Sequence, residues 1–526
     1  MVSTVRASTS SGNAVRTRVL PVLVGTLGAA LLTAFAFLAR AGDPGANNWP
    51  VFWELRSSDN GVLFQVVQDV FAGRVLDWSF SPQVYVFPEL PISALGYLIA
   101  GGDVYRYYLV VAVLANALLF LALLLVVSVI YRTGTPWGRV GRAALAFTPL
   151  VALPLLGTSW LQSFHLAPTY YYGMYLAIIA GPAIFFVRRR WTRVALASGF
   201  ALTAASNPLL LVFCVPPLVL VLIVVAIRAG LRAVARPAAL AGVIVAPALL
   251  LRFTLFAPLQ GTSPFSYVDP EIFADRISVI FPYLEAVTTD PVARTTFVVG
   301  AVLAVICLVG AIVAAVLLLT KRLPLEPRVL SVVYLGSLPI AGLAGTVVLL
   351  ITHQLYLWPV IVAPMVFVLL AFPGRWMPAG LVGASTLLLV LSVVSGSLPN
   401  LAHTDRYFGF RNEETRCLDA ALDPGAIGYA TFSDARRLSL GSADGIRLIP
   451  LKSDLSVATW LTNRDYPRAD AGTFFYVNTA GDEPVFSVDA LEGLFGEPNE
   501  VVECTGYSSL WIYSDDSTIA SHFGVR

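Results

Sequence analysis

Long apolar runs alternate with short polar turns over the first 398 residues. Most of these runs approach the roughly 20 apolar residues that a helix needs to cross a bilayer. The pattern predicts eleven membrane-spanning helices, with residues 206–208 alone separating the fifth from the sixth. The predicted helices span residues 18–39, 105–131, 140–157, 170–187, 193–206, 209–227, 237–257, 296–319, 329–351, 355–372 and 377–398.

Composition agrees with this pattern, because 57% of the residues are hydrophobic and only 13% are charged. A soluble domain carries about 25% charged residues. The sequence therefore predicts an α-helical polytopic membrane protein and excludes a soluble globular one.

The distribution of charge predicts an orientation. The turns that would face the cytoplasm hold 17 arginines and lysines, whereas the opposite loops before residue 399 hold six. Cytoplasmic loops carry the excess of Lys and Arg in membrane proteins. We therefore expect a cytoplasmic N-terminus, long outer loops at 41–104 and 258–295, and an outer C-terminal region. The net charge of +2 averages these surfaces and gives no indication of nucleic-acid binding.

The hydrophobic pattern changes after residue 398. Residues 399–526 hold 19 acids and ten bases and no membrane-spanning run. Apolar alternation predicts strands at 428–432, 447–452 and 473–478 and a strand pair within 500–514, while helical spacing predicts helices at 412–422 and 487–495. We expect a transmembrane domain over 1–398 and a small extracytoplasmic α/β domain over 399–526.

Of the four cysteines, two lie in predicted spans and two in the outer region. Cys214 and Cys307 are interpreted as small apolar side chains in helix packing. Cys417 and Cys504 lie near the start and the end of the outer domain, where an oxidising exterior permits a bridge. Closing so long a loop would contribute about 4 kcal/mol. A disulfide and a pair of buried thiols both stay open.

Acidic, aromatic and proline residues are concentrated between Asp59 and Leu95 in the first outer loop. Apolar residues at helical spacing predict an amphipathic helix over 61–73 that lies in the membrane interface. Asp59 precedes this helix, where it would either cap free N–H groups or act as a general base on a hydroxyl. Glu89 follows Phe87-Pro88 at the predicted start of a second short helix, whose positive end favours a carboxylate.

The order of these residues resembles the first outer loop of the GT-C superfamily of integral membrane glycosyltransferases. The match runs through Asp59, Gly73, Ser81-Pro82, Tyr85, Phe87-Pro88 and Leu90-Pro91. In that superfamily an Asp or Glu of this loop activates the acceptor, and the donor is typically a sugar on a polyprenyl phosphate. The chain departs from the pattern at Asp59-Asn60, where many relatives carry two adjacent acids.

The resemblance implies a GT-C-like fold and an enzyme of a bacterial plasma membrane. It implies sugar transfer from a polyprenyl-phosphate donor to a glycan or glycolipid acceptor of the cell envelope, with Asp59 as the general base. A single displacement through an oxocarbenium-like state would invert the anomeric carbon. Tyr85 and Glu89, in the same loop, are candidate substrate-binding residues.

Further candidates lie at the outer ends of predicted helices. The departing phosphate would need cations or N–H donors there. Arg252 lies inside the seventh predicted helix, and an intramembrane arginine is either functional or snorkels to the interface. His353 and His165 are the other candidate phosphate ligands, although each is also explained as an interfacial residue. Candidate sugar contacts are Gln354, Tyr267 and Asp269, the last two in the loop 258–295.

No zinc spacing, Walker loop or dinucleotide fingerprint occurs in the sequence. No cofactor is required, and a divalent ion bound together with Asp59 stays open. Three alternatives remain: a ligase-type glycosyltransferase that uses a late outer loop, a transporter or lipid flippase, and a non-catalytic envelope-assembly protein.

Overall fold

The computed structural model describes residues 9–41, 60–131, 134–152, 155, 166, 171–261, 289, 291–349, 390, 401, 403–408, 410–466, 473–479, 488–514 and 516–523. Six of the predicted site residues lie outside this part of the chain: Asp59, His165, Tyr267, Asp269, His353 and Gln354. The predicted helix at 355–372 also lies outside it, as does all of 377–398 except residue 390.

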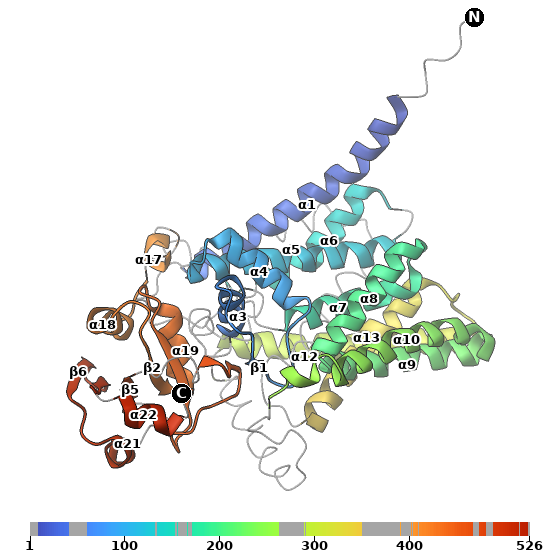
Figure 1. The fold of residues 1–526 in the computed structure, drawn as a ribbon. Helices are drawn as coiled ribbons and strands as arrows, with labels where there is room; N and C mark the ends of the chain where they lie inside the picture. Colours follow the sequence, from blue (N-terminus) through green and yellow to red (C-terminus); the bar gives the residue numbers. More distant parts are fainter. Residues whose placement is uncertain are drawn as a thin grey trace, which may run out of the picture.

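The described part is mostly helical, with a small C-terminal sheet region (Figure 1). The helices before residue 400 are α1 (Thr9–Ala41), α3 (Val62–Phe71), α4 (Glu89–Ala100), α5 (Val104–Ile130), α6 (Pro136–Ala152), α7 (Tyr172–Phe186), α8 (Arg190–Ser206), α9 (Leu209–Ala229), α10 (Leu231–Phe253), α12 (Pro291–Leu319) and α13 (Pro327–Leu349), with a short 3-10 helix η3 (Ala257–Leu259) after α10.

Five of the described helices are long and apolar enough to cross a membrane. The apolar segments are Val19–Ala41, Val104–Ile130, Leu209–Ala229, Leu231–Phe253 and Ala301–Leu319. Helices α6, α7, α8 and α13 coincide with four other predicted spans. The described residues therefore support a membrane protein, whereas the predicted count of eleven spans is not established by them.

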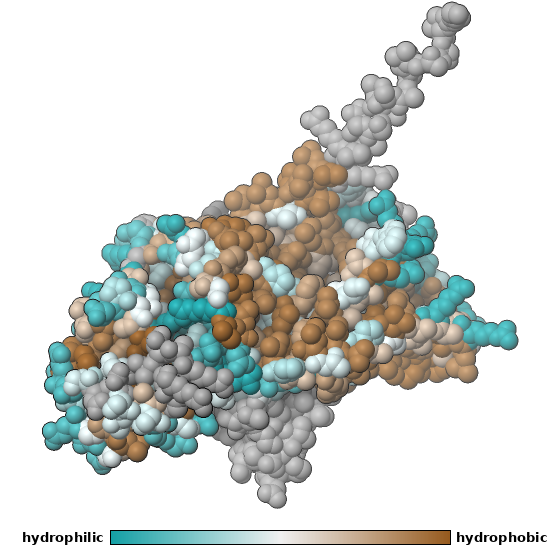
Figure 2. Space-filling model, in the orientation of Figure 1, coloured by the Kyte–Doolittle hydropathy of each residue, from teal (hydrophilic) through white to brown (hydrophobic). Residues whose placement is uncertain are grey.

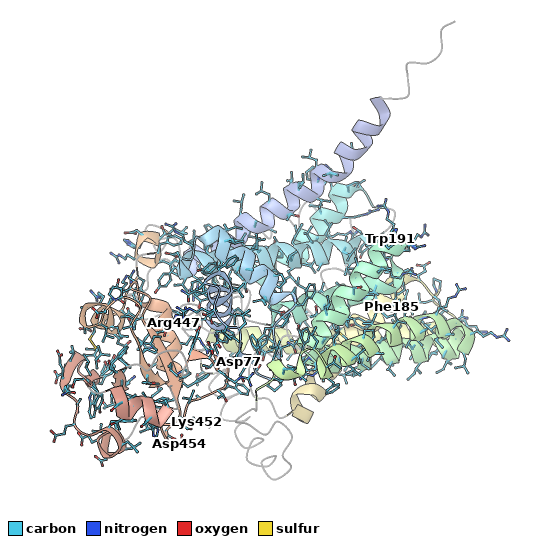
Figure 3. The ribbon with its side chains drawn as sticks, viewed as in Figure 1. Asp77, Phe185, Trp191, Arg447, Lys452 and Asp454 are labelled. Atoms are coloured by element: carbon cyan, nitrogen blue, oxygen red, sulfur yellow. A yellow bond between two sulfur atoms is a disulfide. The ribbon has the colours of Figure 1, made fainter. Side chains whose placement is uncertain are left out.

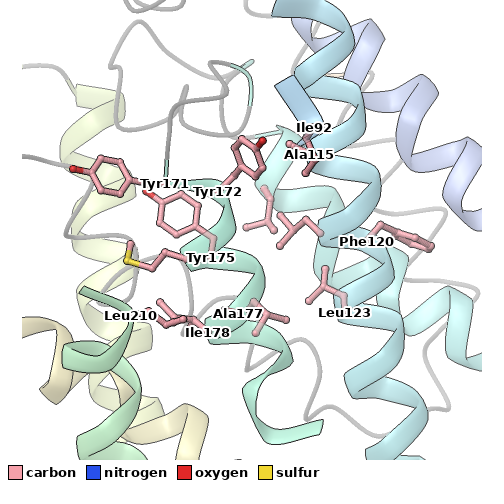
Figure 4. Packing of buried hydrophobic residues seen from close by; sticks show 14 of the residues in the cluster. Ile92, Ala115, Phe120, Leu123, Tyr171, Tyr172, Tyr175, Ala177, Ile178 and Leu210 are labelled. Atoms are coloured by element: carbon pink, nitrogen blue, oxygen red, sulfur yellow. The ribbon is translucent and has the colours of Figure 1, made fainter. Parts of the chain in front are cut away.

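Helix α5 lies at the centre of the helical packing. It contacts α1, α4, α6 and α7. Figure 4 shows its Ala115 and Leu123 beside Tyr172 and Ala177 of α7, so a small and a large apolar side chain from each helix pack in one buried cluster. Figure 2 shows a broad apolar surface over the helices with hydrophilic surfaces at both ends, which is the pattern of a protein that sits in lipid.

The C-terminal region forms one mixed five-stranded sheet of order β3-β2-β5-β7-β6. Parallel pairing joins β2 to β3 and to β5, while β7 runs antiparallel to β5 and β6. The strands are β2 (Ile427–Thr431), β3 (Arg447–Leu451), β5 (Phe474–Asn478), β6 (Glu500–Thr505) and β7 (Ser508–Ile512). Alternate residues of each strand face opposite sides of the sheet, so the sheet needs cover on both faces.

Helices cover both faces of this sheet. One face packs Leu418, Ala435 and Leu438 from α18 (Glu413–Ala421) and α19 (Phe432–Gly441). The other face packs Leu491 and Ile519 from α21 (Val488–Phe495) and α22 (Asp516–Phe523). The strands and the two helices predicted from the sequence are confirmed. Helices α19 and α22 were not predicted, and α19 is the helix nearest to the first outer loop.

Cys417 of α18 and Cys504 of β6 form a disulfide with a Cα–Cα distance of 5.3 Å. It joins a covering helix to an edge strand across 87 residues of chain. Cys214 and Cys307 are buried free thiols.

The apolar helices before residue 400 are called the membrane-type helices below. The segment predicted as the first outer loop forms a layer between them and the C-terminal domain (Figure 1). The predicted amphipathic helix is confirmed as α3, and Gly73 follows it with a φ of +67°. Its surroundings differ from the prediction, because Val62, Leu63, Val66 and Val67 are buried inside the protein while Val70 and Phe71 are exposed. Phe71 stacks on Tyr97 of α4 with ring centroids 5.4 Å apart.

Candidate functional site at the junction of the first outer loop and the C-terminal domain

Three distant segments of the chain meet at a short strand, β1 (Trp78–Ser79). On one side β1 pairs antiparallel with β4 (Thr462–Asn463) of the C-terminal domain. On the other side Phe80 N–H donates to the Leu259 carbonyl oxygen, and Gly261 N–H donates to the Phe80 carbonyl oxygen, both at 2.7 Å. Backbone hydrogen bonds therefore fix the first outer loop to both the C-terminal domain and the segment around η3 that follows α10.

Asp69 of α3 is the centre of this junction and is fully buried. Its carboxylate accepts hydrogen bonds from Trp78 Nε1 at 3.0 Å, Asn463 Nδ2 at 3.1 Å and Tyr466 Oη at 2.6 Å. It also pairs with the Arg447 guanidinium at 3.0 Å. A buried carboxylate is stable only when it is paired and hydrogen-bonded, and Asp69 meets both conditions.

Three of the four partners of Asp69 come from the C-terminal domain, so Asp69 connects that domain to the first outer loop. Burial raises the pKa of the Tyr466 phenol above its usual range, so this tyrosine stays neutral and donates its proton to Asp69. A second pair joins the same segments at the surface, where Arg464 lies 2.6 Å from Asp77. Figure 3 shows Asp77 and Arg447 between the C-terminal domain and the helices.

Helix α19 lies against the N-terminal end of α3. Arg436 Nε donates to Gln65 Oε1 at 3.1 Å, and its Nη2 donates to the Leu461 carbonyl oxygen. A methyl group placed on Gly61 would lie 2.1 Å from Leu440 Cδ1, so the two segments are in close contact. Residue 61 is two positions after Asp59 in the chain.

A cavity of about 290 Å³ lies between the first outer loop and the C-terminal domain. Its volume is at the lower end of the range for small-molecule sites, about 300–1,000 Å³. Aromatic side chains provide much of its wall: Phe64, Trp78, Tyr105, Phe408, Phe410, Phe432 and Tyr466. Its polar wall includes Gln65, Gln68, Asp103, Arg411, Arg436 and Arg447.

Glu89 lies apart from this cavity, at the start of α4. It is fully buried, and Oε1 accepts the Gly173 N–H of α7 at 3.0 Å while Tyr172 Oη donates to the Glu89 carbonyl oxygen at 3.0 Å. Oε2 has no hydrogen-bond partner among the described residues. Burial raises the pKa of the Glu89 carboxyl to about 8, and the two backbone hydrogen bonds oppose this shift. The group is therefore mostly protonated at neutral pH.

Tyr85 is also buried, with its hydroxyl 2.9 Å from Ser81 Oγ. The loop around it rests on the end of α8, because Val84 N–H donates to the Ser206 carbonyl oxygen and Phe87 N–H donates to Ser206 Oγ, both at 2.9 Å. The structure thus fixes the segment that carries Tyr85 and Glu89, with contacts to protein groups at both residues.

Arg252 lies near the end of α10 and is 8% exposed, which argues against snorkelling to an open surface. Its guanidinium donates to the Ala205 carbonyl oxygen at 3.4 Å and to Gln260 Oε1 at 3.3 Å. In the described part of the chain no carboxylate pairs with it. Both described acceptors of this guanidinium are therefore uncharged groups.

The structure places only three of the predicted substrate or phosphate ligands: Arg252, Tyr85 and Glu89. The sequence missed the Asp69 cluster and the cavity beside it. Asp69 had one visible signal, as a lone acid among the apolar residues of α3. In the described part of the chain no group of three or more His, Cys, Asp or Glu residues could hold a metal ion.

No protein-family model matches this chain, and no curated protein matches it.

Proposed function

We propose that this protein is a membrane glycosyltransferase of the GT-C type. It moves a sugar from a polyprenyl-phosphate donor to a glycan or glycolipid acceptor on the outer face of a bacterial plasma membrane. The proposal rests on the sequence of the first outer loop and on one structural observation. That loop is held rigidly between the membrane-type helices and the C-terminal domain, beside a cavity of a size suited to a sugar.

This rigidity matters because transfer requires the acceptor hydroxyl to be aligned with the anomeric carbon of the donor. The loop residues that follow Asp59 are fixed by backbone pairing, by Asp69 and by the ends of α7 and α8. Catalytic groups carried on such a supported segment are held more precisely than groups on a free loop.

Asp59 is the base in the proposal because of the resemblance in sequence, and the geometry of Asp69 and Glu89 argues against these two acids of the same loop. The Asp69 carboxylate is buried and already binds four protein donors, so it cannot contact the hydroxyl group of an acceptor substrate. Glu89 has a pKa of about 8 and is mostly protonated at neutral pH, whereas a general base must be ionised.

In the proposed step Asp59 removes the proton of an acceptor hydroxyl. The acceptor oxygen then forms a bond to the anomeric carbon while the bond from that carbon to the phosphate oxygen breaks. Polyprenyl phosphate leaves with the electron pair of the broken bond, and Arg252 is the described candidate that would stabilise its charge.

The test is transfer of labelled sugar from polyprenyl-phosphate donors by purified protein, comparing wild type with Asp59→Asn. We expect the substitution to lower turnover by about 10²–10⁴-fold, the usual contribution of a general base. Asp454→Asn is the matched control, because Asp454 is an exposed acid whose contacts are to Ser456.

Equal activity of the wild type and a folded Asp59→Asn variant would contradict the assignment of the base. Absence of transfer from every donor, in protein that is folded and monodisperse, would contradict the proposed function. It would favour a transporter, a flippase or a non-catalytic assembly protein instead.

A further inference from the structure

Two glutamines of α3 line the cavity one helical turn apart, and each is oriented by an arginine of the C-terminal domain. Gln65 Oε1 accepts from Arg436 Nε at 3.1 Å, and Gln68 Oε1 accepts from Arg447 Nη2 at 3.3 Å. A guanidinium has donors only, so the amide oxygen has to face it. The orientation of both amides is therefore determined by chemistry.

The other end of each amide is an NH₂ group. In the described part of the chain neither Gln65 Nε2 nor Gln68 Nε2 has a hydrogen-bond partner. Both side chains are partly exposed and both line the cavity. The cavity wall therefore presents two donor groups at fixed positions.

An acceptor is supplied by the start of α5. Asp103 lines the cavity and uses one carboxylate oxygen to cap this helix, accepting Arg106 N–H at 2.8 Å. It has no ion-pair partner among the described residues, and its second oxygen is left for a ligand. Asp103 is the sole carboxylate among the described residues that line the cavity.

Aromatic rings complete the wall. Tyr105, Phe408, Phe410 and Phe432 line the cavity and are partly exposed. A sugar has hydroxyl groups at its edges, which suit amide and carboxylate partners, and C–H groups on its faces, which suit aromatic rings.

The charged side chains of the cavity wall indicate whether the cavity suits a neutral or an anionic ligand. Of the three arginines in the wall, Arg447 pairs with Asp69 at 3.0 Å and Arg411 pairs with Asp419 at 3.1 Å. Arg436 donates to Gln65 and to the Leu461 carbonyl oxygen. The three arginines are thus balanced in number by three carboxylates, Asp69, Asp419 and the Asp103 of the wall, which favours an uncharged ligand.

We propose that this cavity binds an uncharged oligosaccharide and holds the acceptor glycan between the first outer loop and the C-terminal domain. The assignment as acceptor rests on the proposed function, whereas binding itself does not. The structure gives Gln65, Gln68 and Asp103 the hydrogen bonds to sugar hydroxyls and gives Phe410 and its neighbours the contacts with sugar faces.

Equilibrium binding to the purified full-length protein, without donor, tests the proposal. The probes are short neutral gluco-, galacto-, manno- and arabino-oligosaccharides, with an oligogalacturonide and inorganic phosphate as anionic comparisons. We expect at least one neutral oligosaccharide to bind and the anionic probes to bind more weakly.

The informative variants are Gln65→Glu and Gln68→Glu. Glutamate keeps the oxygen that the arginine needs, replaces the NH₂ donor with a second oxygen and adds a negative charge beside that arginine, so a purely structural role predicts unchanged or higher stability. A ligand-binding role predicts a loss of affinity of about tenfold for each donor, the equivalent of one good hydrogen bond.

Two matched pairs provide controls. Asp103→Asn keeps the helix cap and should weaken binding, whereas Asp454→Asn changes an exposed acid outside the cavity and should not. Phe410→Leu should weaken binding, whereas Tyr507→Leu, on the exposed turn between β6 and β7, should not.

Failure of every neutral probe to bind wild type would overturn the inference, as would tighter binding of the anionic probes or unchanged affinity in the double glutamate variant. The two proposals fail separately. Binding without transfer would contradict the proposed transferase activity and support the oligosaccharide site. Transfer without oligosaccharide binding would support the activity and contradict the site.

Discussion

The Glu89 carboxyl lies at the N-terminal end of α7, a helix to which it does not belong. It accepts the Gly173 N–H, one of the amide groups that the first turn of a helix leaves without a partner. The sequence predicted correctly that Glu89 begins a short helix. It could not predict the contact with α7, because the two residues are 84 positions apart and nothing in local pattern connects them.

The raised pKa of Glu89 predicts a pH dependence of stability. The ordinary pKa of a glutamate carboxyl is 4.5 and burial raises the pKa of Glu89 to about 8, so between these values the folded protein keeps a proton that the unfolded chain has lost. Stability from this group is therefore present at low pH and falls as pH rises through that window. Glu89→Gln carries no titrating proton, so its unfolding temperature should fall less than that of wild type over the same range. Thermal unfolding of both proteins in detergent checks this, and parallel curves would contradict it.

Gly173 is the other residue of this contact. A Cβ atom there would lie 2.3 Å from Pro88 Cδ and 2.6 Å from Glu89 Oε1, which forces α4 and α7 apart. We expect Gly173→Ala to destabilise the protein by about 1–3 kcal/mol, as overpacking does. Gly310→Ala in α12 is the control, because a Cβ atom there meets nothing within 4 Å. Equal unfolding temperatures for the two variants would show that the α4–α7 contact is not tight.

Among the elements, α3 shows most clearly what the sequence reveals and what it conceals. Apolar spacing predicted the helix, but it assigned the apolar side to the membrane interface. In the structure one side packs on protein, and Asp69, within that side, pairs with Arg447 across 378 residues of chain. The strands β1 and β4 have two residues each, too few for any periodicity. Hydrophobic periodicity therefore could not predict the junction, although it did predict the helices and strands around it.

Two ion pairs that join these elements differ in burial, and their loss should differ accordingly. Asp69→Asn leaves Arg447, whose side chain is 14% exposed, beside an uncharged amide at a fully buried position, and it should cost about 3 kcal/mol. Asp77→Asn removes a pair whose side chains are 35–38% exposed, and it should cost at most about 1 kcal/mol. Thermal unfolding and limited proteolysis of the C-terminal domain distinguish the two variants. Equal effects would mean that Asp69 does not hold the domain.

At the scale of the whole molecule, the positions of the cations predict that the first outer loop and the C-terminal domain face outward together. Their backbone pairing places them on one side of the helices, which agrees with that expectation. The eleven spans predicted from hydropathy depend in part on residues outside the described ranges, so the topology calls for a measurement.

Cysteine labelling provides that measurement. The native cysteines should not react with a thiol reagent, since two are buried and two form a disulfide. We expect a membrane-impermeant thiol reagent to label Asp454→Cys in intact cells and to label Arg232→Cys only after permeabilisation. Both positions are exposed. The reverse pattern would place the C-terminal domain in the cytoplasm and remove the proposed outer active site.

The junction also has a consequence for how the protein is made. Asp69 and Trp78 leave the ribosome early, but Asn463, which bonds to the Asp69 carboxylate, follows 394 residues later. Until then the β1 strand lacks its β4 partner, and the Asp69 carboxylate lacks Asn463 and Tyr466. The junction is therefore completed only when residues 462–466 have been synthesised. A chain interrupted before residue 447 would therefore lack both the β4 partner of β1 and the arginine that pairs with Asp69.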